Sequence, residues 1–272
     1  MKITLLNHET VDQKETIDNM HSDEFYYSHL GLERALSYSS LKWLLQSPKW
    51  FEHKRRKPTP ETQALRDGKL VHTQILEPHK YDQFTFVDTS SKNTTKWKLA
   101  KEQNGASMTY TLKEKYMCNR ICTAFLQNDS CTSFLAGASE VEVPMLKEID
   151  GLAIRGKADI LRPGVFVADV KTTNDGLNDR ELYDGTLKNQ FAYTIEKYDY
   201  DLQAYLYTQL YDVPDFYWLV VCKTTTDIGV FKASQETLDS GKAKLEASLA
   251  LYKAFFVDEL IDLSQYHKQG TI

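Results

Sequence analysis

The sequence predicts an α/β fold in which a sheet of about five strands is covered by helices on both faces. Helical and strand-like patterns follow one another in the order helix, three strands, helix, two strands, helix. Only short turn signals, Asp150-Gly151 and Pro163-Gly164, separate the three central strands. A chain of 272 residues can bury a large core. We therefore expect one domain over residues 36–272, preceded by an irregular lead-in over residues 1–35.

The region before the strands is expected to be mainly helical. Residues 37–56 have serines suited to a helix N-cap, leucines at helical spacing, and an interruption at Pro48. A second helical pattern runs from residue 61 and ends before Pro78. Residues 88–107 are rich in polar residues and indicate a surface segment around a short helix. Residues 110–136 are predicted to be mostly helical.

Five segments predict the strands. The first three are "SEVEVPML", "LAIRGKADIL" and "VFVADVKT", and the later two are "DFYWLVVCKT" and "IGVFKA". A helical stretch over roughly residues 186–211 separates the two groups. An amphipathic helix over residues 234–256 closes the chain.

The composition argues against membrane and disulfide-stabilised classes. The chain has no run of 18 apolar residues, and its N-terminus lacks the apolar core of a signal peptide. We therefore expect a soluble cytoplasmic protein of a bacterial host cell. The four cysteines form no C-x-x-C pair, and Cys118 and Cys122 lie four residues apart in a helical pattern. No iron–sulfur cluster is expected from this spacing.

The charge distribution is uneven. The net charge of −5 does not favour a nucleic-acid partner, because such domains often carry a basic excess. However, Lys54, Arg55, Arg56 and Lys57 form a strongly basic run, and further lysines cluster over residues 92–101. A solvated helix face explains such a run equally well, so the run alone does not decide between the two readings.

Residues 152–173 combine two apolar strands with charged side chains that a plain core would not need. If Pro163-Gly164 forms the turn, opposed residues have numbers that sum to 328, so Asp159 faces Asp169. Opposed Cβ atoms lie about 5 Å apart, and like charges there are destabilising. Lys171 shares a strand face with Asp169. The opposite face of that strand is apolar, which predicts a strand covered on that side.

Two carboxylates at this spacing must share a proton, pair with basic groups or bind a cation. A hard divalent cation such as Mg²⁺ suits carboxylate, water and phosphate oxygens. Acid-x-Lys triplets also arise by chance, and this chain has others, such as Asp67-Gly68-Lys69. A plain salt-bridge network is therefore the alternative. Only Asp169-Val170-Lys171 lies on a predicted strand with a second acid across a tight turn.

The hairpin resembles the core of the PD-(D/E)XK nuclease superfamily. Its surroundings are similar to the RecE-type, exonuclease VIII-like proteins of phages and prophages. Five segments carry the resemblance, in the family's order: "SYSSLKWLLQSPKWFEH", "DGKLVHTQILEP", "GLAIRGKADIL", "VADVKTT" and "YDYDLQAYLY". The resemblance implies a restriction-endonuclease-like core, a central mixed sheet flanked by helices, with an N-terminal helical part.

Carried over residue by residue, the resemblance implies a set of site residues. Asp159 and Asp169 would bind the metal, with His72 as an added ligand or neighbour, and Lys171 would be the catalytic lysine. Residue 169 is Asp where much of the superfamily has Glu. Four further residues are assigned to the site region by the family segments or by the preceding strand: Gln203, Tyr207, Glu77 and Glu140. Gln203 and Tyr207 share one helix face, so helix packing is their alternative role.

The resemblance also implies the activity and the partners. It implies a Mg²⁺-dependent exodeoxyribonuclease, with Mn²⁺ as a substitute, that digests linear double-stranded DNA from 5′ to 3′. The 3′ tails would serve phage-type recombination, with a phage single-strand annealing protein as partner and a homo-oligomer as the active form. The basic run Lys54–Lys57 would hold the DNA backbone. Two alternatives remain open: a structure-specific or restriction-type endonuclease of the same superfamily, and a non-catalytic DNA-binding relative.

Overall fold

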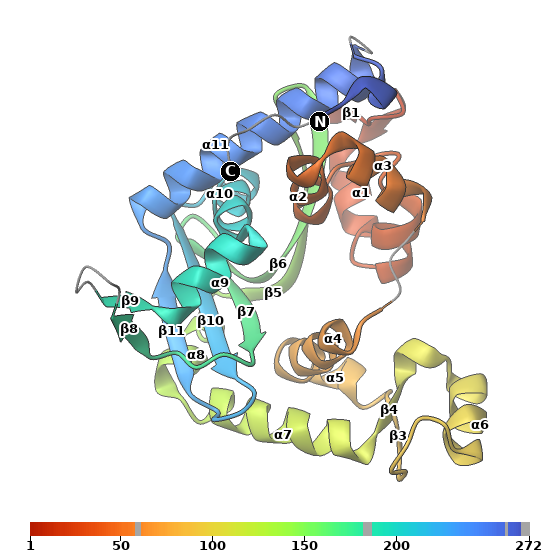
Figure 1. Ribbon diagram of the computed structural model, residues 1–272, viewed down its shortest axis with the longest axis vertical. Coiled ribbons are helices and arrows are strands. Elements are labelled where there is room, and N and C mark those ends of the chain that lie inside the picture. The colour runs from red at the N-terminus through yellow and green to blue at the C-terminus, as the bar shows by residue number, and fades with distance from the viewer. Residues whose placement is uncertain (58–60, 182–186, 259–260, 268–272) are drawn as a thin grey trace.

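A computed structural model describes residues 1–57, 61–181, 187–258 and 261–267. Its centre is a mixed five-stranded sheet with the strand order β11-β10-β7-β6-β5 (Figure 1). The strands are β5 (Glu140–Ile149), β6 (Leu152–Arg162), β7 (Phe166–Thr173), β10 (Asp215–Cys222) and β11 (Ile228–Lys232). Helices flank this sheet, so the predicted α/β fold with its five strands is confirmed.

The turn between β5 and β6 is a two-residue hairpin turn. Asp150 and Gly151 both have positive φ angles, 52° and 75°, as a type I′ turn requires. Ile149 and Leu152 pair across the turn. This pair sets the register along the whole length of the two strands.

The turn between β6 and β7 sets a second register, which the sequence predicted. Gly164 adopts a φ of 71°, and Leu161 pairs with Val167 as expected. The antiparallel pairing ends at Ile160 and Ala168. Asp159 and Asp169, the next residues in register, therefore lie where the two strands separate.

β7 pairs with β10 in parallel, and β11 joins β10 as an antiparallel edge strand. The connection from β7 to β10 contains the short strands β8 (Asp179–Glu181) and β9 (Leu187–Asn189), then α9 (Gln190–Tyr198) and α10 (Tyr200–Tyr211). The predicted helical stretch began at residue 186, which lies outside the described residues. Asp199 divides this stretch into two helices, because its backbone is left-handed with a φ of 55°.

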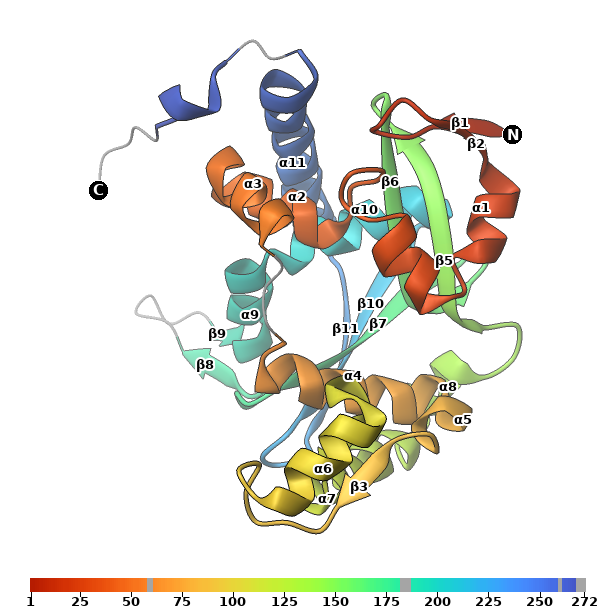
Figure 2. The same cartoon turned by 90° about the vertical axis from the view of Figure 1, so that its right-hand side faces the viewer.

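Alternate residues of β7 face two separate cores, so the sheet is covered on both sides. Val167 belongs to a core shared with α2 (Tyr38–Gln46), α10 and α11 (Gln235–Tyr252). Ala168 belongs to a second core shared with α4 (Gln63–Leu76) and α7 (Leu112–Leu126). Figures 1 and 2 show these two helical layers on opposite sides of the sheet. The apolar face predicted for β7 is thus buried under α4 and α7.

Helix α10 approaches β6 closely at one glycine. A Cβ on Gly156 would lie 2.7 Å from Cδ1 of Leu210, so a larger residue would push the helix away. This close approach brings the polar side chains of α10 within reach of β6 and β7.

Short elements complete the fold. They are α3 (Pro48–Arg56), α5 (Pro78–Tyr81), β3 (Thr85–Val87), α6 (Thr95–Asn104), a 3₁₀ turn at Ala106–Met108, β4 (Thr109–Thr111), α8 (Asp129–Leu135), a π-helix at Lys253–Val257 and a 3₁₀ turn at Leu263–Gln265. The closing helix predicted to residue 256 thus changes from α to π geometry after Tyr252. The predicted domain extends to residue 272, but residues 268–272 lie outside the described part of the chain.

The first 35 residues differ from the irregular lead-in that the sequence predicted. They form β1 (Lys2–Thr4), β2 (Thr10–Asp12), α1 (Gln13–Asn19) and a π-helix at Phe25–His29. Buried residues of this segment, including Met20 and Leu30, form a third core with Leu146 and Ala153 of the central sheet. The apolar residues are spaced irregularly along the sequence, so contacts with the sheet, which periodicity does not reveal, determine the structure of this segment.

Among the described residues, no helix combines the length and the hydropathy needed to cross a membrane.

Candidate active site

Charged side chains converge where β6 and β7 separate. Beyond the last backbone pair, the Asp159 carboxylate occupies the gap between the strands, and its Oδ2 accepts a hydrogen bond from the Val170 N–H at 2.8 Å. The Nδ1 atom of His72, on α4, lies 3.2 Å from the same Oδ2. Two residues separated by more than eighty positions therefore meet at one oxygen atom.

The ring of His72 is oriented by the backbone of β7. Its Nε2 lies 2.5 Å from the carbonyl oxygen of Val170. A carbonyl only accepts, so Nε2 carries the proton and Nδ1 keeps its lone pair. Burial lowers the pKa of His72. A neutral histidine whose second nitrogen is fixed by a backbone carbonyl is a typical metal ligand.

Glu142 of β5 is the third member of the cluster. One ligand atom from each of His72, Glu142 and Asp159 lies within 4.8 Å of the others. In β5, Val141 pairs with Ile160 and Val143 with Ala158, so Glu142 lies opposite Asp159. Glu142 also has a φ of 51°, a strained backbone conformation for a glutamate in a strand.

Sequence reasoning missed Glu142, although a signal was present. Counting outward from the Asp150-Gly151 turn, opposed residues have numbers that sum to 301, as 142 and 159 do. The sequence instead singled out Glu140. In the structure Glu140 is exposed and pairs with Leu161, two residues further from Asp159.

The two carboxylates of the cluster resist ionisation. Burial, with the nearby negative charge of Asp169, raises the pKa of Asp159 well above its usual value. Burial and the charge of Asp159 raise the pKa of Glu142 to about 7, although Lys157 opposes the shift. These shifts show that the site lacks positive charge for its carboxylates, which a divalent cation would supply.

Asp169 points toward α10 and is held by two side chains. Gln203 Nε2 donates to Asp169 Oδ1 at 2.6 Å. Lys171 Nζ lies 2.7 Å from Oδ2 in an ion pair, while that oxygen accepts no hydrogen bond of good geometry. Oδ2 therefore retains a lone pair directed away from its partners, next to the Asp159 cluster.

Lys171 is buried and remains charged. Burial favours the neutral amine, but the Asp169 carboxylate outweighs this effect and raises the pKa of Lys171 above its usual value. The ammonium also lies 4.7 Å from the centre of the Tyr200 ring, a cation–π distance. At neutral pH Lys171 is thus a cation that can donate hydrogen bonds and offset negative charge.

Tyr207 and Lys157 support the cluster from the β6 side. The Tyr207 hydroxyl donates to the carbonyl oxygen of Lys157 at 3.2 Å and does not contact Asp159 or Asp169 directly. The Lys157 ammonium lies 2.8 Å from Asp23 and 3.7 Å from Glu142. Lys157 thus connects the N-terminal segment to the carboxylate cluster, a contact that the sequence did not suggest.

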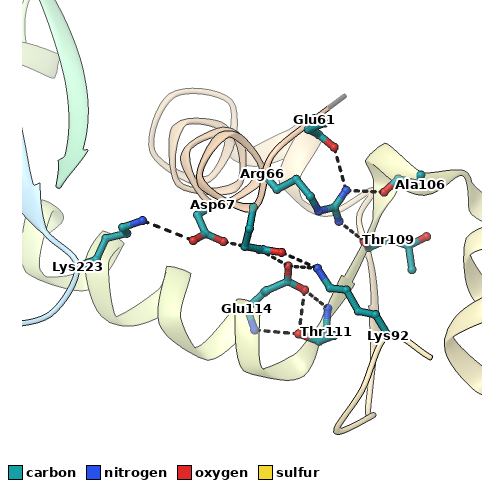
Figure 3. A network of polar contacts seen from close by, with 10 residues as sticks. Glu61, Arg66, Asp67, Lys92, Ala106, Thr109, Thr111, Glu114 and Lys223 are labelled. Carbon is teal, nitrogen blue, oxygen red and sulfur yellow. Dashed lines mark hydrogen bonds and ion pairs between the residues drawn. The ribbon is translucent and has the colours of Figure 1, made fainter. Parts of the chain in front are cut away.

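The N-terminal half of α4, which carries His72, is fixed by a separate polar network (Figure 3). Arg66 donates to the carbonyl oxygens of Ala106 and Thr109 at 2.7 and 2.6 Å. Gln63 donates to Glu114 of α7 at 2.7 Å. Through these contacts α4 is held against the neighbouring elements, and His72 is presented to β7.

Two other sequence-predicted groups lie outside the cluster. Glu77 ends α4 and lies 2.6 Å from Lys80 in an ion pair, as expected of a residue that braces a helix end. In the basic run, Arg55 and Arg56 both form ion pairs with Glu52, and Arg55 also pairs with Glu33. Lys54 lies 4.6 Å from the Trp50 ring centre, and Lys57 is exposed.

The arrangement fits a divalent metal ion. One imidazole nitrogen and carboxylates from three strands face a common point, and two of these carboxylates have raised pKa values in the absence of a cation. Hard oxygen donors with a single imidazole suit Mg²⁺ or Mn²⁺ rather than a thiolate-bound metal. The cysteines are buried in other parts of the chain.

Comparison with solved structures supports the fold. A protein from Eubacterium rectale, provisionally named an exonuclease, is similar with a TM-score of 0.63 and 17% sequence identity, over 92% of this chain and 95% of that one. A phage-related exonuclease from Haemophilus somnus 129PT is listed with a TM-score of 0.34 and 15% identity, over 84% of this chain and 96% of that one. No curated protein is significantly similar in sequence.

One family model matches residues 37–259, which include the whole sheet and every residue of the cluster. The match begins at the start of α2 and omits the N-terminal segment. The chain therefore belongs to the PDDEXK-like domain of unknown function DUF3799.

Proposed function

We propose that this protein is a Mg²⁺-dependent exodeoxyribonuclease that digests one strand of linear duplex DNA from 5′ to 3′. One observation carries the proposal: His72, Glu142 and Asp159 converge beside the Asp169–Lys171 pair at the point where β6 and β7 separate. A structural salt-bridge network would pair its acids with bases. Here two acids have raised pKa values, and the single buried lysine is already paired.

The metal would be held by His72 Nδ1 and by the carboxylates of Glu142, Asp159 and Asp169. When bound, Mg²⁺ supplies Lewis-acid polarisation of the scissile phosphate and lowers the pKa of bound water. The Val170 carbonyl keeps the His72 ring in the required tautomer. Gln203 fixes the Asp169 carboxylate through Oδ1 and leaves Oδ2 for the site.

Lys171 would orient the attacking water and offset the negative charge that develops on the phosphate. Its raised pKa favours this role over that of a general base, because a base must be neutral before it accepts a proton. Tyr207 would act on the shape of β6 through the Lys157 carbonyl, as a positioning residue.

The polarity and the duplex preference rest on the resemblance to RecE-type exonucleases. Both structural relatives reported above carry exonuclease names. The same resemblance supports action in the cytoplasm of a bacterial host, a homo-oligomeric active form and cooperation with a phage single-strand annealing protein.

DNA binding would draw on the basic run at the end of α3. The ion pairs of Arg55 and Arg56 with Glu52 reduce the charge available to phosphates. Lys54 and Lys57 are therefore the main backbone contacts we propose in this run. Each lost phosphate contact lowers the slope of log affinity against log salt by about 0.9 on duplex DNA.

One assay tests the function against its alternatives. Linear duplex labelled at the 5′ or the 3′ end, and covalently closed circles, are incubated with Mg²⁺ or with EDTA. We expect Mg²⁺-dependent release of the 5′ label as mononucleotides or short fragments, with the circles intact. Cleavage of closed circles would establish an endonuclease instead. Binding without turnover in Mg²⁺ or Mn²⁺ would establish a non-catalytic DNA-binding relative.

A further inference from the structure

A row of aromatic rings and lysines leads from Lys171 to the protein surface. We call it the aromatic–lysine ladder, and it consists of Tyr38, Lys42, Lys197, Tyr198 and Tyr200. It begins at Tyr200, whose ring lies under the Lys171 ammonium. The Tyr198 and Tyr200 rings stack with centres 5.7 Å apart and an interplanar angle of 30°.

The break between α9 and α10 creates this stack. Asp199 is left-handed, so the chain turns between Tyr198, the last residue of α9, and Tyr200, the first residue of α10. Lys244 of α11 lies 2.8 Å from the Asp199 carboxylate and neutralises it. The Tyr38 hydroxyl donates to the Tyr198 carbonyl at 2.6 Å and ties α2 to the same point. The stack is therefore held from three helices.

The cations of the ladder surround Tyr198. The ammonium of Lys197 lies 5.2 Å from the Tyr198 ring centre, and that of Lys42 lies 5.9 Å from it. Burial lowers the pKa of Lys42, and the positive charge of Lys171 lowers it further, which places the two ammonium groups within electrostatic reach. Neither Lys42 nor Lys197 forms an ion pair with any residue that the structure describes.

We propose that the aromatic–lysine ladder is a binding site for single-stranded DNA, which it guides to or from the metal site. Tyr198 is 41% exposed, unusually accessible for a ring held by so many contacts. Exposed rings beside unpaired cations are the recurrent composition of surfaces that bind single strands, because unpaired bases stack on rings and phosphates attract ammonium groups. A duplex offers no base faces along its length, so the ladder distinguishes single strands from duplex DNA.

This inference rests on the proposed nuclease function for its meaning, but its test does not require cleavage. Binding of a short single-stranded oligonucleotide is measured in EDTA, beside the same oligonucleotide with abasic positions in place of its bases. We expect the wild-type protein to prefer the base-bearing strand by roughly tenfold or more. Tyr198→Ala should remove this preference without weakening the abasic strand, and Tyr198→Phe should restore it.

The lysines should give the opposite signature. Lys42→Ala with Lys197→Ala should weaken both strands equally and flatten the salt dependence, by about 0.7 in slope for each lost phosphate contact on a single strand. Tyr116→Ala is the matched control, because Tyr116 is 67% exposed on α7 against the other face of the sheet. It should change neither strand.

The outcomes separate the two proposals. Equal binding of both strands by the wild-type protein, or unchanged binding by Tyr198→Ala, would overturn the ladder. So would a duplex that competes as well as the single strand. A protein that cleaves no DNA but shows the Tyr198-dependent preference would retain the ladder and lose the nuclease function. A protein that cleaves DNA with no such preference would do the reverse.

Discussion

Two acidic clusters lie against helix α4, and their carboxylates differ in how they are paired. At the N-terminal half of the helix, Glu114 accepts hydrogen bonds from Lys92, Thr111 and Gln63 at 2.7 to 2.8 Å. Burial alone would raise the pKa of Glu114, but these donors outweigh it and lower the pKa to about 2.

Further along the same helix, His72 contacts Asp159, whose pKa is raised by burial and by Asp169. Glu142 behaves similarly. Both clusters are partly or wholly buried, so burial does not distinguish them. The difference is the supply of donors and positive charge. The first cluster is complete without a ligand and stabilises the fold, whereas the second lacks a cation and is suited to bind one.

The largest expected effect is the loss of cleavage when the second cluster loses an acid. Asp159→Asn and Asp169→Asn each remove one negative charge and keep the side-chain shape. We expect cleavage of linear duplex in Mg²⁺ to fall to the background seen in EDTA, while metal-free stability is kept or increased because repulsion is relieved. Chemical denaturation in EDTA and cleavage assays in Mg²⁺ measure the two effects. Wild-type cleavage rates in either variant would contradict the site.

Lys171→Met should have the next largest effect. This substitution keeps most of the side-chain stem but removes the ammonium, so turnover should fall on the order of 10²-fold or more. Mg²⁺ affinity, measured by calorimetry, should remain. Lys232→Met is the matched control, because Lys232 also lies 2.7 Å from an aspartate, Asp215, but on the edge strand β11. Lost metal binding together with normal turnover at saturating metal would refute the assigned role of Lys171.

Glu114→Ala should break the complete cluster and affect stability rather than catalysis. It removes a capping-box acid and leaves the Thr111 N–H without its acceptor, which costs roughly 1–3 kcal/mol in free energy of unfolding. The cleavage rate per folded molecule should stay in the wild-type range. Glu102→Ala, at an exposed position of α6, should change neither quantity. A catalytic defect without a loss of stability would mean that the two clusters are not distinct in role.

The pH dependence of metal-free stability should differ in sign between the clusters. The folded-state pKa of Glu142, about 7, exceeds the ordinary value of 4.5, so the folded protein binds the extra proton and stability falls as pH rises between these values. The loss is about 3 kcal/mol at most. The pKa of Glu114 is lowered, so its contribution is present above pH 4.5 and is lost as pH falls toward 2.

Denaturation in EDTA from pH 3 to pH 8 sharpens this comparison. Glu142→Gln should remove the loss on the neutral side, and Glu114→Gln should remove the loss on the acid side. Saturating Mg²⁺ should restore wild-type stability more at pH 8 than at pH 5.5, because protons compete with the metal for the carboxylates. Equal stabilisation by Mg²⁺ at both pH values would argue against a carboxylate metal site.

The sequence predicted the sheet and the Asp159–Asp169 register because turn chemistry is local. Gly164 identifies the turn, and the period of two along a strand determines which side chains are opposed. Glu142 was within reach of the same counting from the Asp150-Gly151 turn. The pairing of Arg55 and Arg56 with Glu52 was also visible, since the residues lie three and four positions apart in a helix.

Other features depend on tertiary contacts that a sequence pattern does not contain. The N-terminal segment is ordered by the sheet it packs against, and Lys157 reaches Asp23 only because that segment folds back over β6. The left-handed Asp199 interrupts what reads as one continuous helical pattern. Its conformation is set by Lys244 and by the packing of α10 against α11.

The two tight turns impose a length constraint on this part of the chain. Glu142 and Asp159 face each other by counting from one turn, and Asp159 and Asp169 meet by counting from the other. A single residue inserted into or deleted from either turn would send alternate side chains to the wrong face of the sheet. The turn residues themselves can therefore vary within their φ requirements, but the number of residues between the three acids cannot. Among homologous chains, substitutions should be common in these turns, and insertions or deletions should be confined to loops elsewhere.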